Sequence, residues 1–121
     1  MNDLYVDKVL IVEGKSDKLK VKKIVKESVE IICTNGTISH TKLDEWIECL
    51  DDKDVYILVD ADESGEKLRK LFKREFPHAK HLYIDRTYRE VATAPVHHLA
   101  TVLLGANIDV YTSYLEMGSS Q

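Results

Sequence analysis

Two short runs of apolar residues, each followed at once by carboxylic acids, constrain the fold of this chain more than any other feature. Lys8–Val12 has the sequence KVLIV and precedes Glu13, and Val55–Val59 has the sequence VYILV and precedes Asp60 and Asp62. Continuous runs of Val, Ile and Leu are typical of strands buried on both faces of a parallel sheet. The carboxyl ends of such strands form the ligand-binding edge of an α/β sheet. The sequence therefore predicts three acids at one sheet edge.

Helical patterns alternate with strand patterns along the chain. The expected strands are Lys8–Val12, Glu30–Thr34, Asp54–Val59 and Lys80–Ile84, and the expected helices are Ser16–Glu27, a helix from Thr41 to Leu50 capped by the Thr41 hydroxyl, a helix from just after Asp62 to Phe76, Pro95–Gly105 and a short helix in Asp109–Met117. Strands separated by helices predict an α/β fold, in which right-handed crossovers build a four-stranded parallel sheet flanked by helices in three Rossmann-like layers. The strand order 2-1-3-4 places the first and third strands side by side, at a topological switch point.

Length and composition indicate a single globular domain. The chain has 121 residues with 44% hydrophobic and 31% charged residues, which is ordinary for a folded domain. We expect one domain over 1–121, with a core at about 6–86, a helical segment at 95–117 and a frayed end at 118–121. Cys33 and Cys49 lack a C-x-x-C spacing and are expected to be free thiols. Met1–Leu4 lacks the features of a signal peptide and no apolar run has the length of a membrane span, so we expect a cytoplasmic protein that does not engage membranes.

Basic residues are unevenly distributed in this acidic chain. The net charge of −4 by itself argues against a nucleic-acid partner. Six lysines nevertheless fall within residues 15–26, and five further basic residues fall within 67–74, whereas neither Lys nor Arg follows Arg89. Such clusters either form a basic face beside the acids or are solvated helix surfaces.

Three neighbouring carboxylates require a compensating charge. Two of them about 4 Å apart repel by about 4 kcal/mol at an effective dielectric near 20, which is large beside a domain stability of roughly 5–15 kcal/mol. Protonation or a bound Mg²⁺ relieves this repulsion, and Mg²⁺ prefers oxygen ligands. Asp60, Asp62 and Glu13 are therefore the candidate metal ligands, and Glu13 is also the candidate proton carrier. The structural alternative for Asp62 is an N-cap.

Four further residues are candidates for contacts with phosphate or nucleic acid. Lys15 opens a helix whose N-terminus attracts anions, although a solvated lysine explains it equally well. Asn35 and Gly36 form a turn dipeptide, which could also bring backbone groups to a substrate. Arg69 lies on the third helix and has the guanidinium that favours bidentate phosphate contacts.

The motifs in their order resemble the Toprim family, the catalytic module of bacterial primases, topoisomerases and several nucleases. The family pattern is a strand ending in Glu-Gly followed by a strand ending in Asp-x-Asp, here VLIVEG (Val9–Gly14) and ILVDAD (Ile57–Asp62). Glu13–Asp17, Thr34–Gly36 and Asp60–Arg69 are further similar to the N-terminal domain of the ribonuclease that matures bacterial 5S ribosomal RNA. The resemblance spans about Val6 to Arg86 and implies a small stand-alone Toprim fold.

The resemblance also implies roles for individual residues. Glu13 corresponds to the general acid/base of the family, and Asp60 and Asp62 correspond to its Mg²⁺ ligands. Topoisomerase-type members have a third acid two residues later, where this chain has Ser64. That departure, and the absence of room for a strand-passing, zinc-finger or RNA-binding domain, argue against a topoisomerase, a primase or a complete maturation ribonuclease.

Three functions are therefore compared. The first is a nuclease that uses Mg²⁺, or else Mn²⁺, to process phosphodiesters in RNA or DNA, with specificity supplied in part by a protein partner. The second is a non-catalytic Toprim module that binds nucleic acid or protein around a vestigial metal site. The third is a phosphoacceptor receiver domain. The third fits poorly, because a single acid follows the first strand and no lysine follows Lys80.

Overall fold

The computed structural model describes residues 7–116. Its elements in chain order are β1 (Lys8–Val12), α1 (Lys15–Ile24), β2 (Val29–Cys33), α2 (His40–Cys49), β3 (Asp54–Leu58), α3 (Glu63–Glu75), β4 (Lys80–Leu82), α4 (Val96–Gly105) and the 3₁₀ helix η2 (Thr112–Leu115). Strands and helices alternate as the sequence predicts, and the bounds of β1 are those predicted.

The four strands form one parallel sheet in the order β2-β1-β3-β4. This is the predicted order. The central strand β1 pairs with β2 through Leu10 and Ile31 and with β3 through Leu10 and Tyr56. Because β1 and β3 are neighbours and run in the same direction, their carboxyl ends lie at the same edge of the sheet.

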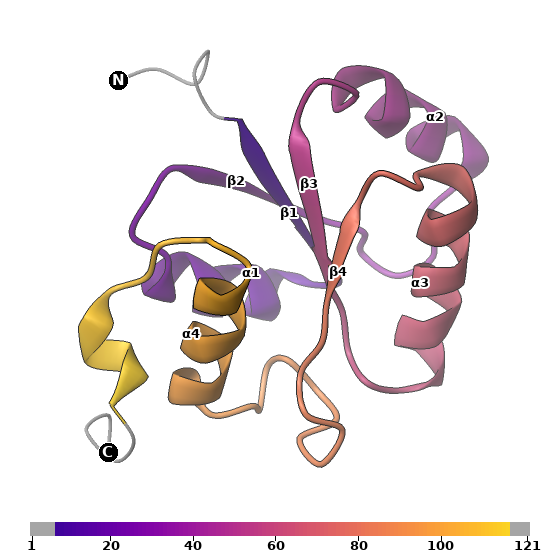
Figure 1. The fold of residues 1–121 in the computed structure, drawn as a ribbon. Helices are drawn as coiled ribbons and strands as arrows, with labels where there is room; N and C mark the ends of the chain where they lie inside the picture. The colour runs from indigo at the N-terminus through magenta and orange to yellow at the C-terminus, as the bar shows by residue number, and fades with distance from the viewer. Residues whose placement is uncertain (1–6, 117–121) are drawn as a thin grey trace.

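Two hydrophobic cores lie on the two faces of the sheet, which explains why β1 is apolar from Val9 to Val12 and β3 is apolar from Val55 to Leu58. In β1, the side chains of Leu10 and Val12 pack on one face and those of Val9 and Ile11 pack on the other. Helices α1 and α4 cover the first face, and α2 and α3 cover the second (Figure 1). The molecule thus has the three layers that were expected.

Helix α1 is shorter than predicted. It ends at Ile24, and Val25 instead forms an antiparallel bridge with Val110. The backbone N–H of Lys26 donates to the Asp109 carbonyl, and the N–H of Tyr111 donates to the Ile24 carbonyl. Pairing with a remote segment therefore ends the helix where its own sequence would continue it.

The N-terminus of α2 also differs from the expectation. Ser39, rather than Thr41, is the N-cap, and its hydroxyl accepts a 3.1 Å hydrogen bond from the backbone N–H of Lys42. Ile38 before the cap and Leu43 after it are both buried in the same core, which is the spacing of a hydrophobic staple. This apolar pair fixes the start of the helix at Ser39.

The last part of the described chain is less helical than expected. The short helix predicted within Asp109–Met117 is reduced to η2, and Met117 lies outside the described residues, as does the end expected to fray, residues 118–121. Within residues 7–116, no helix has both the length and the apolar character needed to cross a membrane.

Candidate metal centre

Three carboxylates meet at the carboxyl ends of β1 and β3. Glu13 follows β1, while Asp60 and Asp62 follow β3, and one carboxylate oxygen from each lies within 4.8 Å of the other two. The predicted convergence of these acids is confirmed. All three side chains are half-buried, so the cluster is open to ions while being partly withdrawn from water.

The position of Glu13 depends on the turn into α1. The carboxylate of the buried Asp17 accepts a 3.1 Å hydrogen bond from the backbone N–H of Gly14. This is the reciprocal half of a capping box, in which a side chain of the first turn satisfies the cap residue. On the other side, the N–H of Asn35 donates to the carbonyl of Glu13 at 2.8 Å. Glu13 is therefore held through its own carbonyl, which accepts from Asn35, and through the capping bond of the next residue, Gly14.

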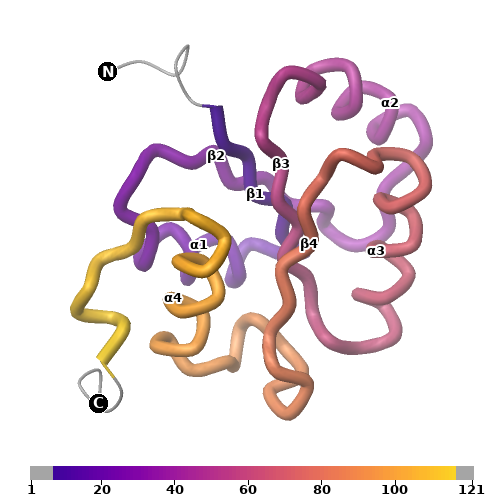
Figure 2. The backbone as a smooth tube through the Cα atoms, in the orientation of Figure 1, coloured from indigo at the N-terminus to yellow at the C-terminus, as the bar shows by residue number. Residues whose placement is uncertain are grey.

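The loop between β4 and α4, orange in Figure 2, fixes Asp60. The backbone N–H of Val91 donates to Asp60 Oδ1 at 2.8 Å, and the N–H of Ala61 donates to the Arg89 carbonyl at 2.7 Å. Lys20 of α1 holds the same loop, since its Nζ donates to the carbonyl oxygens of Val91, Ala92 and Ala94. One of the six clustered lysines is thus a structural anchor near the acids.

Asp62 has two roles available to it. It is the N-cap of α3, and its Oδ1 accepts a 2.8 Å hydrogen bond from the backbone N–H of Gly65. The cap and the acidic cluster are compatible, because a carboxylate has two oxygens and about four acceptor sites. The positive end of the α3 dipole further favours negative charge here.

The electrostatics of the cluster match a site that needs a cation. Burial, with the charges of Asp60 and Asp62, raises the pKa of Glu13 to about 7. Burial also raises the pKa of Asp60, although the hydrogen bond from Val91 opposes the shift. The three side chains offer oxygen ligands, carry charge of the same sign and are partly buried. Together these properties fit a divalent metal ion. The residues that would hold it are Glu13, Asp60 and Asp62.

We expect the metal-free protein to lose stability as pH rises from about 4.5 to about 7. The folded state holds the Glu13 proton with a pKa of about 7, against an ordinary value of 4.5. The bound proton therefore contributes fully to the free energy of unfolding at pH values below the ordinary pKa. This contribution is lost as pH rises to the pKa of the folded state. Allowing for solvent screening, the loss is on the order of 1–2 kcal/mol. Urea unfolding in chelator at a series of pH values measures it, with Glu13→Gln as the comparison. A parent curve parallel to that of Glu13→Gln would contradict the assignment.

The other predicted site residues lie at the same edge but differ in exposure. Lys15 is exposed at the start of α1. Asn35 and Gly36 form an exposed turn after β2 with φ values of 56° and 92°. Both angles lie in the left-handed region that glycine and asparagine adopt most readily. The backbone bond from Asn35 to Glu13 places this turn beside the acids.

Arg69 is buried, with 2% of its surface exposed. Its Nη2 donates to the carbonyl oxygens of Leu82 at 2.7 Å and Val59 at 3.3 Å, and its Nη1 lies 3.2 Å from Nδ1 of His81. Burial and the charge of Arg69 lower the pKa of His81 to about 4, so that ring is neutral. Arg69 therefore ties α3 to the ends of β3 and β4, and its guanidinium borders a cavity beside Asp62.

Three supporting residues were not identified from the sequence. These residues are Asp17, Lys20 and Val91. Lys20 and Val91 act on the acids through contacts between remote segments, which no local pattern indicates. An acid at the third position of a helix is the one signal that could have indicated Asp17. The burial of Arg69 had a signal too, because it shares helical spacing with Gly65, Leu68 and Phe72, which are all buried.

The fold and the acidic cluster define a class of protein. Residues 8–93 match the model of the Toprim domain family. The chain therefore belongs to the Toprim domain family, as its motifs predicted.

The chain is also similar to individual proteins of known sequence or structure. The structure is similar to a solved small Toprim domain protein from Bacillus stearothermophilus, with a TM-score of 0.92 and 58% identity over 96% of this chain and 98% of that one. "Uncharacterized protein YusF" of Bacillus subtilis (strain 168) is 62% identical over 94% of this chain and 78% of its own length. Ribonuclease M5 1 of Ligilactobacillus salivarius (strain UCC118) is 32% identical over 69% of this chain. The chain spans 44% of the length of that ribonuclease.

Proposed function

We propose that this protein is a Mg²⁺-dependent nuclease that acts on phosphodiester bonds in RNA or DNA. The observation that carries the proposal is the meeting of Glu13, Asp60 and Asp62 within 4.8 Å at the edge of the sheet. The similarity to ribonuclease M5 1 supports the substrate class, and the family match supports metal binding at these acids.

The residues have separable roles in this proposal. Asp60 and Asp62, together with Glu13, would hold the cation, which would supply charge stabilisation to a phosphate when bound. Glu13, with a pKa near 7 in the metal-free protein, is suited to hold and transfer a proton at neutral pH. Lys15 and the N–H groups at the start of α1 would bind phosphate oxygens, and the Asn35-Gly36 turn would bound the substrate on the β2 side.

The direct test is cleavage. Labelled structured RNA and single-stranded DNA are incubated with the protein in Mg²⁺, Mn²⁺ or chelator. Cleavage that needs the cation supports a nuclease. Binding that persists in chelator and in Asp60→Asn, with no turnover of any substrate, would instead favour a non-catalytic module that binds nucleic acid.

Mg²⁺ should raise the melting temperature. A cation present at 100 times its Kd stabilises the folded state by about 2.7 kcal/mol, which corresponds to roughly 10 °C in a domain of this size. Asp62→Asn should reduce the shift strongly while keeping the cap of α3, because Asn caps helices as well as Asp does. Differential scanning calorimetry measures both.

The matched control for this experiment is Glu63→Gln. Glu63 is the exposed acid next to Asp62 and contributes no ligand to the cluster. It should respond to Mg²⁺ as the parent does. Equal shifts in the parent and in Asp62→Asn would remove Asp62 from the metal site.

A further inference from the structure

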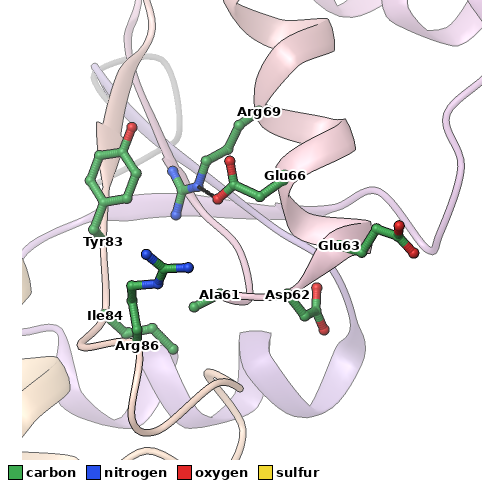
Figure 3. A pocket seen from close by; sticks show the side chains of 8 residues that line it. All are labelled: Ala61, Asp62, Glu63, Glu66, Arg69, Tyr83, Ile84 and Arg86. Carbon is green, nitrogen blue, oxygen red and sulfur yellow. Dashed lines mark ion pairs between the residues drawn. The ribbon is translucent and has the colours of Figure 1, made fainter.

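A cavity of about 670 Å³ opens beside the acidic cluster, between α3 and the chain that follows β4 (Figure 3). Its lining combines acidic, basic and aromatic side chains: Ala61, Asp62, Glu63, Glu66, Arg69, Tyr83, Ile84 and Arg86. Asp62 belongs to both the cluster and the cavity. A molecule in the cavity would therefore lie next to whatever is bound at the three acids.

Tyr83 offers an aromatic surface to this cavity. Its side chain is unusually open for a large apolar residue, at 53% exposure, and the guanidinium of Arg69 lies 4.0 Å from the centre of its ring. Arg69 is itself fixed by the carbonyl oxygens of Val59 and Leu82. The guanidinium covers one face of the ring and holds it in place. A nucleobase would stack on the part of the ring that stays exposed.

Two arginines in the cavity have donors without partners. The exposed Arg86 makes no hydrogen bond or ion pair with the other residues between 7 and 116, and its guanidinium points into the cavity in Figure 3. The buried Nε of Arg69 has no hydrogen-bond partner in the described part of the chain, and its ion pair with Glu66 is 4.0 Å long. The exposed guanidinium of Arg86 is therefore the group suited to phosphate and base oxygens.

The acids in the cavity explain why it would not bind an anion by itself. Asp62, Glu63 and Glu66 outnumber Arg69 and Arg86. A cation at the cluster would offset the charge of Asp62, and Glu66 is already paired with Arg69. Binding of an anionic ligand should therefore require the divalent cation.

We infer that this cavity binds one unpaired nucleotide of a single-stranded nucleic acid, with its base against Tyr83 and its phosphate on Arg86. The inference rests on the proposed function, since it places this nucleotide next to the phosphate at the acids. The cavity volume lies within the range of about 300–1,000 Å³ for small-molecule sites. A paired base is stacked within its duplex and cannot lie against the ring. The substrate class is therefore single-stranded or looped nucleic acid.

Binding is measured in the Glu13→Gln background, so that the probe stays intact. The probe is a fluorescein-labelled single-stranded oligothymidine in Mg²⁺, followed by anisotropy, with a duplex of equal length as competitor. Tyr83→Ala should weaken binding about 10-fold, and Tyr83→Phe should not. Tyr111→Ala is the matched control, because Tyr111 has a similar exposure and lies outside the cavity. It should bind as the background protein does.

The role of Arg86 is tested by the salt dependence of binding. Arg86→Ala should reduce the slope of log K against log salt by about 0.7, as the loss of one phosphate contact to a single strand does. Arg74→Ala is the control, because Arg74 is exposed, pairs with Glu75 and lies outside the cavity. Its slope should be unchanged.

The results distinguish a failure of the cavity assignment from a failure of the nuclease proposal. If Tyr83→Ala and Arg86→Ala bind as the background protein does, or if the duplex competes as well as the single strand, the cavity assignment is overturned while cleavage by the parent remains possible. If the parent cleaves nothing and Tyr83→Ala still weakens binding, the nuclease proposal fails and the cavity assignment is supported.

Discussion

Glu13→Gln should lower the rate of phosphodiester cleavage by about 10²- to 10⁴-fold, the usual contribution of a general acid or base. The substitution keeps the size and one oxygen of the side chain and removes its capacity to transfer a proton. It should also remove the cost of burying a carboxylate beside Asp60 and Asp62, which raises the pKa of Glu13, so the variant should be at least as stable as the parent. Initial rates in Mg²⁺, with melting temperatures of both proteins, measure these effects together.

Glu90→Gln is the matched control for this substitution. Glu90 is exposed, its charge acts on Asp60, and it offers no ligand atom to the cluster. A general loss of negative charge near the site would slow both variants, whereas a proton-transfer role slows Glu13→Gln alone. If Glu13→Gln cleaves as fast as the parent, Glu13 is not the proton carrier.

Gly65→Ala should destabilise the protein by about 3 kcal/mol, the upper part of the usual range for overpacking. A Cβ at this position would lie 2.0 Å from the carbonyl oxygen of Asp60 and 2.9 Å from its carbonyl carbon. Because these are backbone atoms, α3 must move away from the end of β3. Gly65 also donates the capping bond to Asp62, so this movement would disturb two of the three acids.

Thermal unfolding with and without Mg²⁺ measures both consequences. We expect a melting temperature lower by the order of 10 °C and a smaller response to the cation. Gly105→Ala is the control, since nothing lies within 4 Å of a Cβ placed there at the end of α4. An unchanged melting temperature and an unchanged Mg²⁺ response in Gly65→Ala would show that the close approach to Asp60 is not required.

The sequence predicted what local patterns determine. The apolar runs before Glu13 and Asp60 identified the two central strands, and the topology of parallel sheets then brought their ends together. Convergence of the three acids followed from those two facts. The identity of the family followed from the same motifs, because they occur in order at compatible spacing.

Remote contacts decided the rest. Thr41 and Ser39 are both capping residues, and the burial of Ile38 with Leu43 in the tertiary core selects Ser39. Helix α1 stops because Val25 pairs with Val110. The end of α1 has no signal in the residues around it, whereas the start of α2 has one in the staple spacing of Ile38 and Leu43.

Arg69 shows a further limit of local patterns. It is a charged residue among exposed basic residues, which by itself predicts a surface position. In the structure it is 2% exposed and bonded to the ends of two strands. The sequence could not indicate that a guanidinium would link those ends. Its predicted contact with phosphate stays a prediction.

The bond from Val91 to Asp60 has a consequence for how the protein is made. Asp60 and Val91 are 31 residues apart, and Lys20 and Ala94 are 74 apart. During synthesis the acids emerge from the ribosome well before the segment that immobilises Asp60. A nascent chain would thus carry all three carboxylates without an ordered site, and competence to capture a cation would arise only after the segment around Val91 had been translated and docked.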